Sequence, residues 1–158
     1  MGGSKTMLRG ESMLALLDAP GRRLLDFWME ASAAGLPSRS NFEPLDHLAA
    51  WPGIQIVDVL PSPDEFRYRL VGTREVEVRG RDPTGETVAE GFFGDSAESV
   101  LENYRMTRLE QCPICVLGNY RKQSGLPVYD ISLFLPLAGA TAEIAFILVY
   151  SYQSFDIP

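Results

Sequence analysis

Cys112 and Cys115 have the C-x-x-C spacing that can form a redox-active dithiol or half of a zinc site. A zinc site would need a second pair of ligands, and His47 is the only histidine in the chain. A thioredoxin-like dithiol should open a helix, whereas residues 116–120 have the composition of a strand. If both cysteines lie in that strand, their odd separation places their side chains on opposite faces. The spacing therefore predicts two small apolar residues at a strand edge, with neither zinc nor a disulfide.

His47 and the glycine-rich residues 80–85 are the next candidates for cofactor binding. Haem needs an axial ligand inside its pocket, usually histidine, but His47 precedes the predicted sheet and has leucines nearby. A covalent flavin site would need a reactive cysteine in the middle of the chain, and residues 73–111 contain none. Residues 80–85 also lack the Gly-x-Gly-x-x-Gly pattern of a dinucleotide loop. The sequence argues against haem, covalent flavin and zinc, and it leaves the cofactor unknown.

Asp130 is the best candidate for acid–base catalysis. It lies in the middle of a predicted strand between apolar neighbours, with Ser132 on the same face. A carboxylate in an apolar pocket could act as the general base of an isomerase or dehydratase with a cone-shaped α+β fold. No histidine or second carboxylate is clearly placed to join Asp130, so a cross-strand pair with an arginine, or solvent exposure, is the simpler interpretation. The enzyme remains the alternative hypothesis.

Composition limits the classes of partner. The 158 residues suffice for one domain with one core, and 46% apolar and 22% charged residues are typical of a globular protein. A formal charge of −7 without a basic patch argues against a nucleic-acid partner. The longest apolar run, residues 144–150, is far too short to span a membrane, and no signal peptide is recognisable. Two cysteines alone exclude a disulfide framework, so we expect a cytoplasmic protein.

The first half of the chain predicts helices followed by a hairpin. Leu24, Phe27, Trp28 and Ala31 have helical spacing, and a shorter helix is expected over residues 44–50. Strands over residues 54–60 and 65–71 are joined by a turn-prone Pro-Ser-Pro-Asp segment. In the second strand, alternation places Phe66, Tyr68 and Leu70 on one face and Arg67 and Arg69 on the other. After the second strand, the sequence predicts a short helical segment over residues 73–79.

The second half predicts one longer helix and three strands. Asp95 to Glu98 has the pattern of a capping box, and an apolar stripe continues to about residue 110. Strands over residues 114–120, 128–137 and 143–152 are separated by glycine-containing turns, which indicates an antiparallel meander. The last strand is apolar on both faces, so a cover is needed on its outer side. Leu24, Phe27 and Trp28 of the N-terminal helix are the available cover, and we expect the same helix to support a homodimer.

The order of two strands, short helices, a longer helix and three strands resembles that of a PAS domain. The chain is similar to a family of bacterial single-domain PAS-like proteins that share an N-terminal Trp, a Leu-Pro-Ser-Arg segment, and a strand ending in Arg-Leu-x-Gly-Thr before Gly-x-Asp-x-Thr-Gly. The similarity spans about residues 22–152. Its motif residues in this sequence are Arg39, Arg69, Gly72, Thr73, Gly80, Asp82, Thr84 and Gly85.

This resemblance implies an α+β fold: a five-stranded antiparallel sheet with helices on one face and an N-terminal helical cap. It implies an extension over residues 1–20 that is flexible or helical, a cap over 21–52, a core over 53–152 and a tail over 153–158. The motif residues read as structural, because glycines relieve backbone strain at turns and Thr73 is placed to cap the helical segment after the strand.

The resemblance also implies a sensory or signalling module that binds a small ligand, a protein partner or both, without catalytic residues. Such domains usually enclose a cavity between the sheet and its helices. The inward residues of the strands and the longer helix would line it, and the candidates are Tyr68, Leu70, Tyr104, Leu133 and Phe146. Which side chains face inward depends on strand register, which the sequence leaves open.

Overall fold

Residues 4–42, 53–94, 96–121 and 123–156 are described by the structure, a computed structural model. The expected helix over residues 44–50 lies outside this part of the chain, as does His47. The described helices are α1 (Glu11–Leu14), α2 (Ala19–Ala31), η1 (Ser32–Ala34), η2 (Arg39–Phe42), α3 (Thr73–Arg79), α4 (Val88–Gly91) and α5 (Ala97–Glu110). Among them, none has the length and apolar character needed to cross a bilayer.

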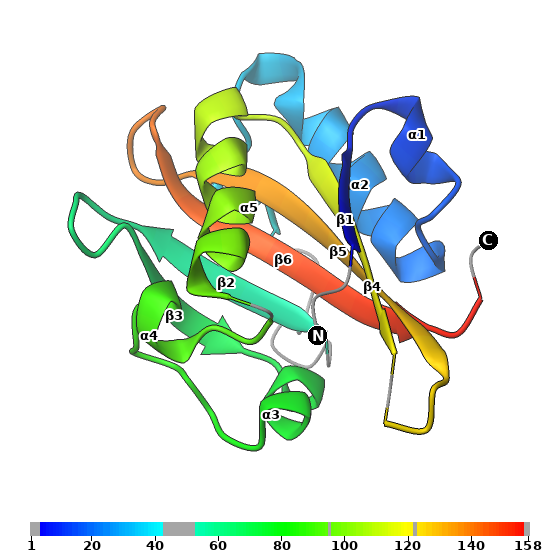
Figure 1. The fold of residues 1–158 in the computed structure, drawn as a ribbon. Helices are drawn as coiled ribbons and strands as arrows, with labels where there is room; N and C mark the ends of the chain where they lie inside the picture. The colour runs from blue at the N-terminus through cyan, green and yellow to red at the C-terminus, as the bar shows by residue number, and fades with distance from the viewer. Residues whose placement is uncertain (1–3, 43–52, 95, 122, 157–158) are drawn as a thin grey trace.

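One antiparallel sheet runs through the described chain in the order β1-β4-β5-β6-β2-β3 (Figure 1). Its strands are β1 (Ser4–Leu8), β2 (Ile54–Val59), β3 (Phe66–Val71), β4 (Ile114–Arg121), β5 (Pro127–Ala138) and β6 (Ile144–Ser154). The predicted hairpin is β2 with β3, and the predicted meander is β4, β5 and β6. Pairing of β6 with β2 places the meander beside the hairpin. The longer helix α5 lies in the chain between β3 and β4, as the sequence predicts.

A sixth strand extends the expected five-stranded sheet. β1 pairs with β4, with Thr6 opposite Leu117, within a segment that the sequence predicts to be flexible or helical. That prediction is wrong for residues 4–8. Met7 and Leu8 pack against the cores on opposite faces of the sheet, so the short strand is held by burial on both sides. β1 thereby covers the edge of β4 that would otherwise be open.

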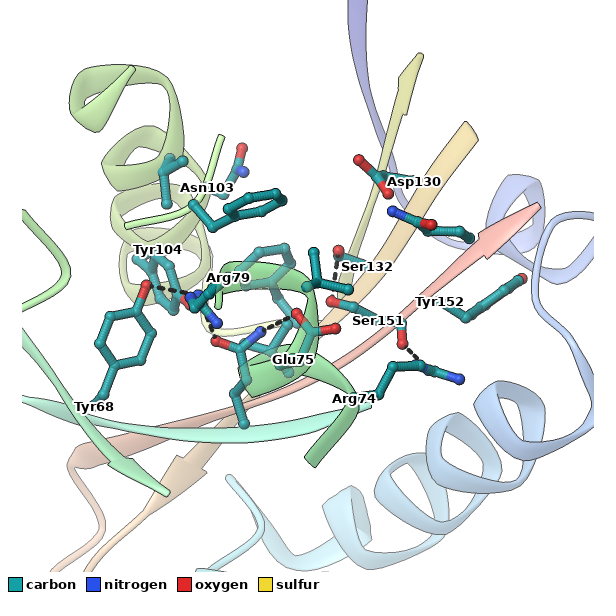
Figure 2. A pocket seen from close by; sticks show the side chains of 17 residues that line it. Tyr68, Arg74, Glu75, Arg79, Asn103, Tyr104, Asp130, Ser132, Ser151 and Tyr152 are labelled. Carbon is teal, nitrogen blue, oxygen red and sulfur yellow. Dashed lines mark hydrogen bonds between the residues drawn. The ribbon is translucent and has the colours of Figure 1, made fainter. Parts of the chain in front are cut away.

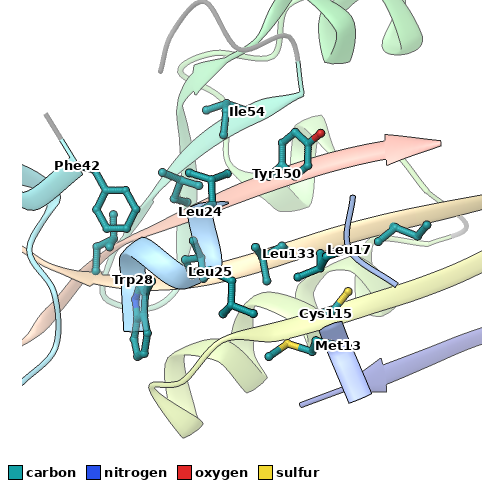
Figure 3. Close-up of a cluster of buried hydrophobic side chains, with 14 of the residues drawn as sticks. Met13, Leu17, Leu24, Leu25, Trp28, Phe42, Ile54, Cys115, Leu133 and Tyr150 are labelled. Atoms are coloured by element: carbon teal, nitrogen blue, oxygen red, sulfur yellow. The ribbon is translucent and has the colours of Figure 1, made fainter. Parts of the chain in front are cut away.

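The N-terminal helices cover one face of the sheet, where the apolar last strand needs a cover (Figure 3). Asp18 caps α2 by accepting the Gly21 N–H at 2.9 Å, and it also accepts the Tyr150 hydroxyl of β6 at 2.9 Å. The Trp28 indole N–H donates to the carbonyl of Pro136 at 2.8 Å. The buried residues of this cap-side core are Met13, Leu17, Leu24, Leu25, Trp28, Phe42, Ile54, Ile56, Cys115, Ile131, Leu133, Leu135, Leu137, Leu148 and Tyr150.

The opposite face carries α4 and α5, with α3 beside them (Figure 1). α5 is capped by Ser96, whose hydroxyl accepts the Ser99 N–H at 3.1 Å, so the helix starts one residue later than the predicted capping box. Tyr104 of α5 packs between Phe66 and Phe134, with ring centroids 5.4 and 5.2 Å away. The buried residues of this helix-side core are Val57, Phe66, Tyr68, Val88, Leu101, Tyr104, Ile114, Val116, Phe134, Ile147 and Val149.

Alternation in β3 is broken by a bulge. Ile56 of β2 pairs with Leu70, but the next residue, Val57, pairs with Tyr68, so Arg69 is an extra residue in β3. Tyr68 therefore belongs to the helix-side core while Leu70 packs against the cap-side core. The prediction that both side chains share one face is wrong, because the extra residue reverses the parity of the strand.

Candidate functional site

A cavity of about 330 Å³ lies between the helix-side face of the sheet, α3 and α5 (Figure 2). It is the size of a small-molecule site and mixes apolar walls with polar groups. Its lining residues are Gln55, Tyr68, Arg74, Glu75, Val78, Arg79, Phe93, Val100, Asn103, Tyr104, Asp130, Ser132, Phe134, Val149, Ser151, Tyr152 and Gln153.

The strand floor of the cavity is polar because the meander alternates. Asp130 and Ser132 point to the helix side of β5, while their neighbours Ile131 and Leu133 belong to the cap-side core. The Ser132 hydroxyl bonds the Ser151 hydroxyl across to β6 at 2.8 Å. The expected shared face of Asp130 and Ser132 is confirmed.

Arg79 ends α3 at one end of the cavity. Gly80 follows it in the left-handed conformation, with φ of 81°, which lets the chain leave the helix there. One guanidinium nitrogen, Nη2, donates to the Tyr68 hydroxyl at 3.1 Å and to the Gln55 side-chain oxygen at 3.3 Å. The Gln55 amide in turn donates to Glu75 at 3.1 Å. This chain of bonds fixes the Arg79 head group against β2 and β3.

Three polar atoms at this site are buried and have no hydrogen-bond partner among the described residues. They are Nε and Nη1 of Arg79 and Oδ1 of Asn103 on α5. A buried polar group without a partner costs about 1 to 3 kcal/mol, and more when it is charged. Both residues line the cavity, so a molecule bound there could supply the missing partners.

Burial governs the electrostatics of the acids in the cavity. Desolvation raises the pKa of Glu75, and the nearby charges of Arg79 and Arg74 oppose that rise. Desolvation also raises the pKa of Asp130, against a hydrogen bond from Gln153. The partner of Asp130 is thus an amide on β6 and not the cross-strand arginine that the sequence suggests. These carboxyl groups hold their protons more strongly than exposed acids do.

A second hollow, of about 480 Å³, continues the cavity toward β1. The two share Phe93, Val100, Asn103, Asp130 and Ser132 in their walls. Its outer end is lined by β1 and β4, which the sixth strand brings into place.

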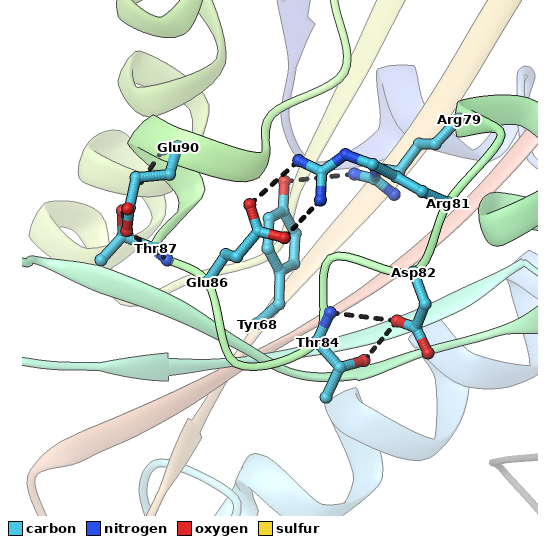
Figure 4. A network of polar contacts seen from close by, with 8 residues as sticks. All are labelled: Tyr68, Arg79, Arg81, Asp82, Thr84, Glu86, Thr87 and Glu90. Carbon is cyan, nitrogen blue, oxygen red and sulfur yellow. Dashed lines mark hydrogen bonds and ion pairs between the residues drawn. The ribbon is translucent and has the colours of Figure 1, made fainter.

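The glycine-rich motif builds the loop behind Tyr68 (Figure 4). Asp82 accepts the N–H of Thr84 at 3.0 Å and its hydroxyl at 2.6 Å, which closes a tight turn. Gly85 has a φ of 92°, where a side chain would be strained, and its N–H donates to the Tyr68 carbonyl at 2.8 Å. Beside this turn, Arg81 pairs with Glu86.

The other motif residues also serve the fold. Gly72, rather than Thr73, is the N-cap of α3, and no side-chain cap bond forms, so the predicted capping role of Thr73 is wrong. Gly72 has a φ of −68°, which any residue adopts, so it relieves no strain. Arg39 and Arg69 both lie over the Phe146 ring, at 5.4 and 5.6 Å, and Arg69 also pairs with a carboxylate of β2 at 2.6 Å.

The candidate pocket residues separate by face. Tyr68 and Tyr104 line the cavity. Leu70, Leu133 and Phe146 instead belong to, or pack against, the cap-side core. The β3 bulge turns the Leu70 side chain to the cap side. Leu133 and Phe146 face that side because they alternate in step with its buried residues in β5 and β6. The expected pocket assignment of these three side chains is therefore corrected.

The cysteines do not form a pair. Cys112 precedes β4, is half-buried, and contacts the Glu110 carboxylate at 3.8 Å, whereas Cys115 is fully buried in the cap-side core. Burial raises the pKa of Cys115 to about 12. Both thiols are free, and no cluster of three metal-ligating side chains occurs within the part of the chain that the structure describes.

Sequence reasoning missed four polar residues of the cavity: Gln55, Glu75 and Arg79, which are hydrogen-bonded to one another in a chain, and Asn103, whose side-chain oxygen has no partner among the described residues. Glu75 and Arg79 are spaced i, i+4, which is a signal for a shared helix face. That spacing alone is common on exposed helices, and only the packing of α3 beside β2 turns this face toward the sheet.

Comparison with known proteins adds to this geometry. A family model described as PAS domain matches residues 17–149. The solved LOV protein of Rhodobacter sphaeroides is 14% identical, covers 73% of this chain and 68% of its own, and has a TM-score of 0.51. A structure described as the RsLOV d2 variant is 16% identical, with the same coverage and a TM-score of 0.50. At these identities the likeness concerns the fold alone. No curated protein matches the chain.

Proposed function

Because the chain belongs to the PAS domain family, we propose that it is a non-catalytic sensory module that binds a small ligand in the cavity beside α5. The observation that carries this proposal is the set of buried polar atoms without partners, on Arg79 and Asn103, in the wall of that cavity. Folded proteins rarely leave such atoms unsatisfied, and those that remain call for an explanation. A bound molecule is the explanation we adopt.

The walls fit a small organic molecule. Val78, Val100, Phe134 and Val149 supply apolar surface, while the polar groups come from the strand floor, from α3 and, at Asn103, from α5. Ligand sites commonly combine a largely apolar lining with a few placed polar groups. α5 provides one wall and β5 and β6 the floor, so a ligand would contact both layers of the domain at once.

The isomerase or dehydratase alternative finds no support. The longest helix on this face, α5, lies in the chain between β3 and β4 instead of preceding the sheet. Asp130 is hydrogen-bonded by Gln153, which is an amide and cannot relay a proton as a histidine does. We therefore do not propose a reaction at Asp130.

We also propose that the module works in the cytoplasm. This location is supported by the two free thiols, which a reducing compartment would maintain.

Association with a second copy or a signalling partner would transmit the ligand state. The homodimer can no longer rest on α2, because Leu24 and Trp28 are buried within the chain itself. Light scattering of the full chain at micromolar concentration decides between monomer and dimer.

A fragment screen with a blocked cavity tests ligand binding. Val100→Trp would place an indole into the cavity, since Val100 lines it from α5. Leu109→Trp is the matched control on the same helix, because Leu109 is 76% exposed. We expect thermal-shift hits on the wild-type protein to be lost with Val100→Trp and kept with Leu109→Trp. Hits that survive Val100→Trp unchanged, with the variant folded, would refute binding in this cavity.

A further inference from the structure

We propose that the ligand carries a carboxylate group and that Arg79 binds it. This inference rests on the proposed function and adds the chemical class of the ligand. It begins with the head group of Arg79, which is held at the cavity wall by Tyr68 and Gln55. The guanidinium carbon also lies over the Tyr68 ring, 5.0 Å from its centroid, so the orientation of the group is set before any ligand arrives, while the hydrogen bonds engage only Nη2.

Arg79 has more hydrogen-bond donors than the described residues supply acceptors for. A guanidinium has five N–H donors and cannot accept a hydrogen bond. One of these belongs to Nε and two to Nη1, and neither nitrogen meets an acceptor from the described residues although both are buried. The missing groups must therefore be acceptor oxygens or nitrogens, and a carboxylate offers two acceptor oxygens with the opposite charge.

The charge of Arg79 also lacks an ion-pair partner among the described residues. Glu75 is the acid of α3 that lines the cavity, but its carboxylate accepts from Gln55, and burial raises its pKa. Arg74, the other arginine of the cavity, differs because its guanidinium donates to the Ser151 carbonyl. Arg79 is thus the cation whose hydrogen bonds and charge remain to be matched by an incoming anion.

The other side chains of the cavity indicate what the ligand contains besides the carboxylate. Apolar side chains from α3, α5 and the strands would enclose a short aliphatic or aromatic body. The unpartnered Oδ1 of Asn103 calls for a donor, such as a hydroxyl group, on that body. A small hydroxylated aromatic or aliphatic carboxylate satisfies both requirements.

Paired probes test the carboxylate directly. Benzoate, para-hydroxybenzoate, phenylacetate and hexanoate would each be titrated against the full chain beside the corresponding primary amide, with calorimetry as the readout. We expect at least one acid to bind about 10-fold or more tightly than its amide, because charge-assisted hydrogen bonds are the stronger ones. The amide keeps the shape of the acid, removes its charge and replaces one acceptor oxygen with an NH2 donor.

Variants then assign the effect to one side chain. Arg79→Gln should weaken the acid about 10- to 100-fold and leave the amide within about threefold. Arg79→Lys keeps the charge and should give an intermediate loss. Arg81→Gln removes the same charge two residues away, where Arg81 is exposed and pairs with Glu86, and should change nothing. If Arg79→Gln does not fold, the acid and amide comparison on the wild-type protein decides.

The outcomes separate the two proposals. Amides that bind as tightly as their acids, or acid binding that survives Arg79→Gln, would overturn the carboxylate assignment. Neutral fragments that bind in a Val100-dependent manner, with no acid binding up to about 10 mM, would overturn it as well and leave the cavity as a ligand site. Failure of both the acids and the fragments to bind would refute both proposals.

Discussion

The two faces of the sheet are built differently. On the cap side, α2 places Leu24 and Trp28 at 0% and 6% exposure against strand side chains, and the buried residues there are almost all apolar (Figure 3). On the helix side, the same strands turn Asp130, Ser132 and Ser151 toward a cavity of about 330 Å³ (Figure 2). The cap side is thus a packed apolar core, whereas the helix side has polar side chains around an open cavity. Departures of this kind are expected where a protein binds something.

Trp28→Ala should show the largest loss on the cap side. The substitution removes a buried indole and its hydrogen bond to the Pro136 carbonyl. We expect the free energy of unfolding to fall by about 3 to 5 kcal/mol, as measured by chemical denaturation. Met29→Ala is the matched control, since Met29 is 55% exposed on the same helix and should change stability by about 0.5 kcal/mol or less. Similar losses for the two variants would mean that α2 does not cover the sheet.

Leu133→Ala and Val100→Ala compare the two faces directly. Leu133 is fully buried in the cap-side core, whereas Val100 is half-buried at the cavity wall. We expect Leu133→Ala to cost about 2 to 5 kcal/mol and Val100→Ala about 1 kcal/mol or less, because a cavity already lies beside Val100. A larger loss for Val100→Ala would place the tighter packing on the helix side and reverse the comparison.

Much of the fold could be predicted from the sequence, because long periodic segments carry it. The alternation of β5 put Ile131 and Asp130 on opposite faces, and the helical spacing of Leu24 and Trp28 identified the cover of the last strand. Strand β1 was missed because residues 4–8 are short and gain their order from β4 and from burial on both faces. The orientation of the Leu70 side chain toward the cap side was missed because it depends on the bulge in β3. A bulge is set by pairing with β2, and the local alternation of the sequence does not encode it.

The site could be predicted only in part. Tyr68 and Tyr104 were found as inward aromatic residues, and they line the cavity. Arg79 and Asn103 were not found, since a charged or amide side chain on a helix usually faces solvent. Their burial follows from the packing of α3 and α5 over the sheet. That packing is tertiary, so no local pattern in the sequence indicates it.

The pH dependence of stability sharpens the comparison further. Burial raises the pKa of Asp130, so the folded protein binds this proton more tightly than the unfolded chain. The contribution of Asp130 to the free energy of unfolding is therefore most favourable below the pKa of the unfolded chain, about 4. That contribution is lost as the pH rises through the raised pKa of the folded protein. We expect the free energy of unfolding of Asp130→Asn, relative to that of the wild type, to increase as the pH rises from 5 to 7.5, as measured by denaturation at each pH.

Asp82→Asn is the control of opposite sign. The bonds from the Thr84 hydroxyl and N–H lower the pKa of Asp82, so its contribution is present above the unfolded pKa and is lost as the pH falls. The stability difference between Asp82→Asn and the wild type should thus shrink at acid pH. A flat difference for Asp130→Asn over the same range would show that Asp130 is solvated and does not line a buried cavity.

Methyl NMR of the ligand complex tests the central claim most directly. The full chain with labelled Val and Leu methyl groups would be titrated with the tightest-binding probe of the carboxylate and amide series. We expect shifts at Val78, Val100 and Val149, which line the cavity, and none at Leu24 and Leu133 of the cap-side core. Shifts centred on Leu24 and Leu133, with the three valines unmoved, would contradict the assignment of ligand binding to the helix-side face.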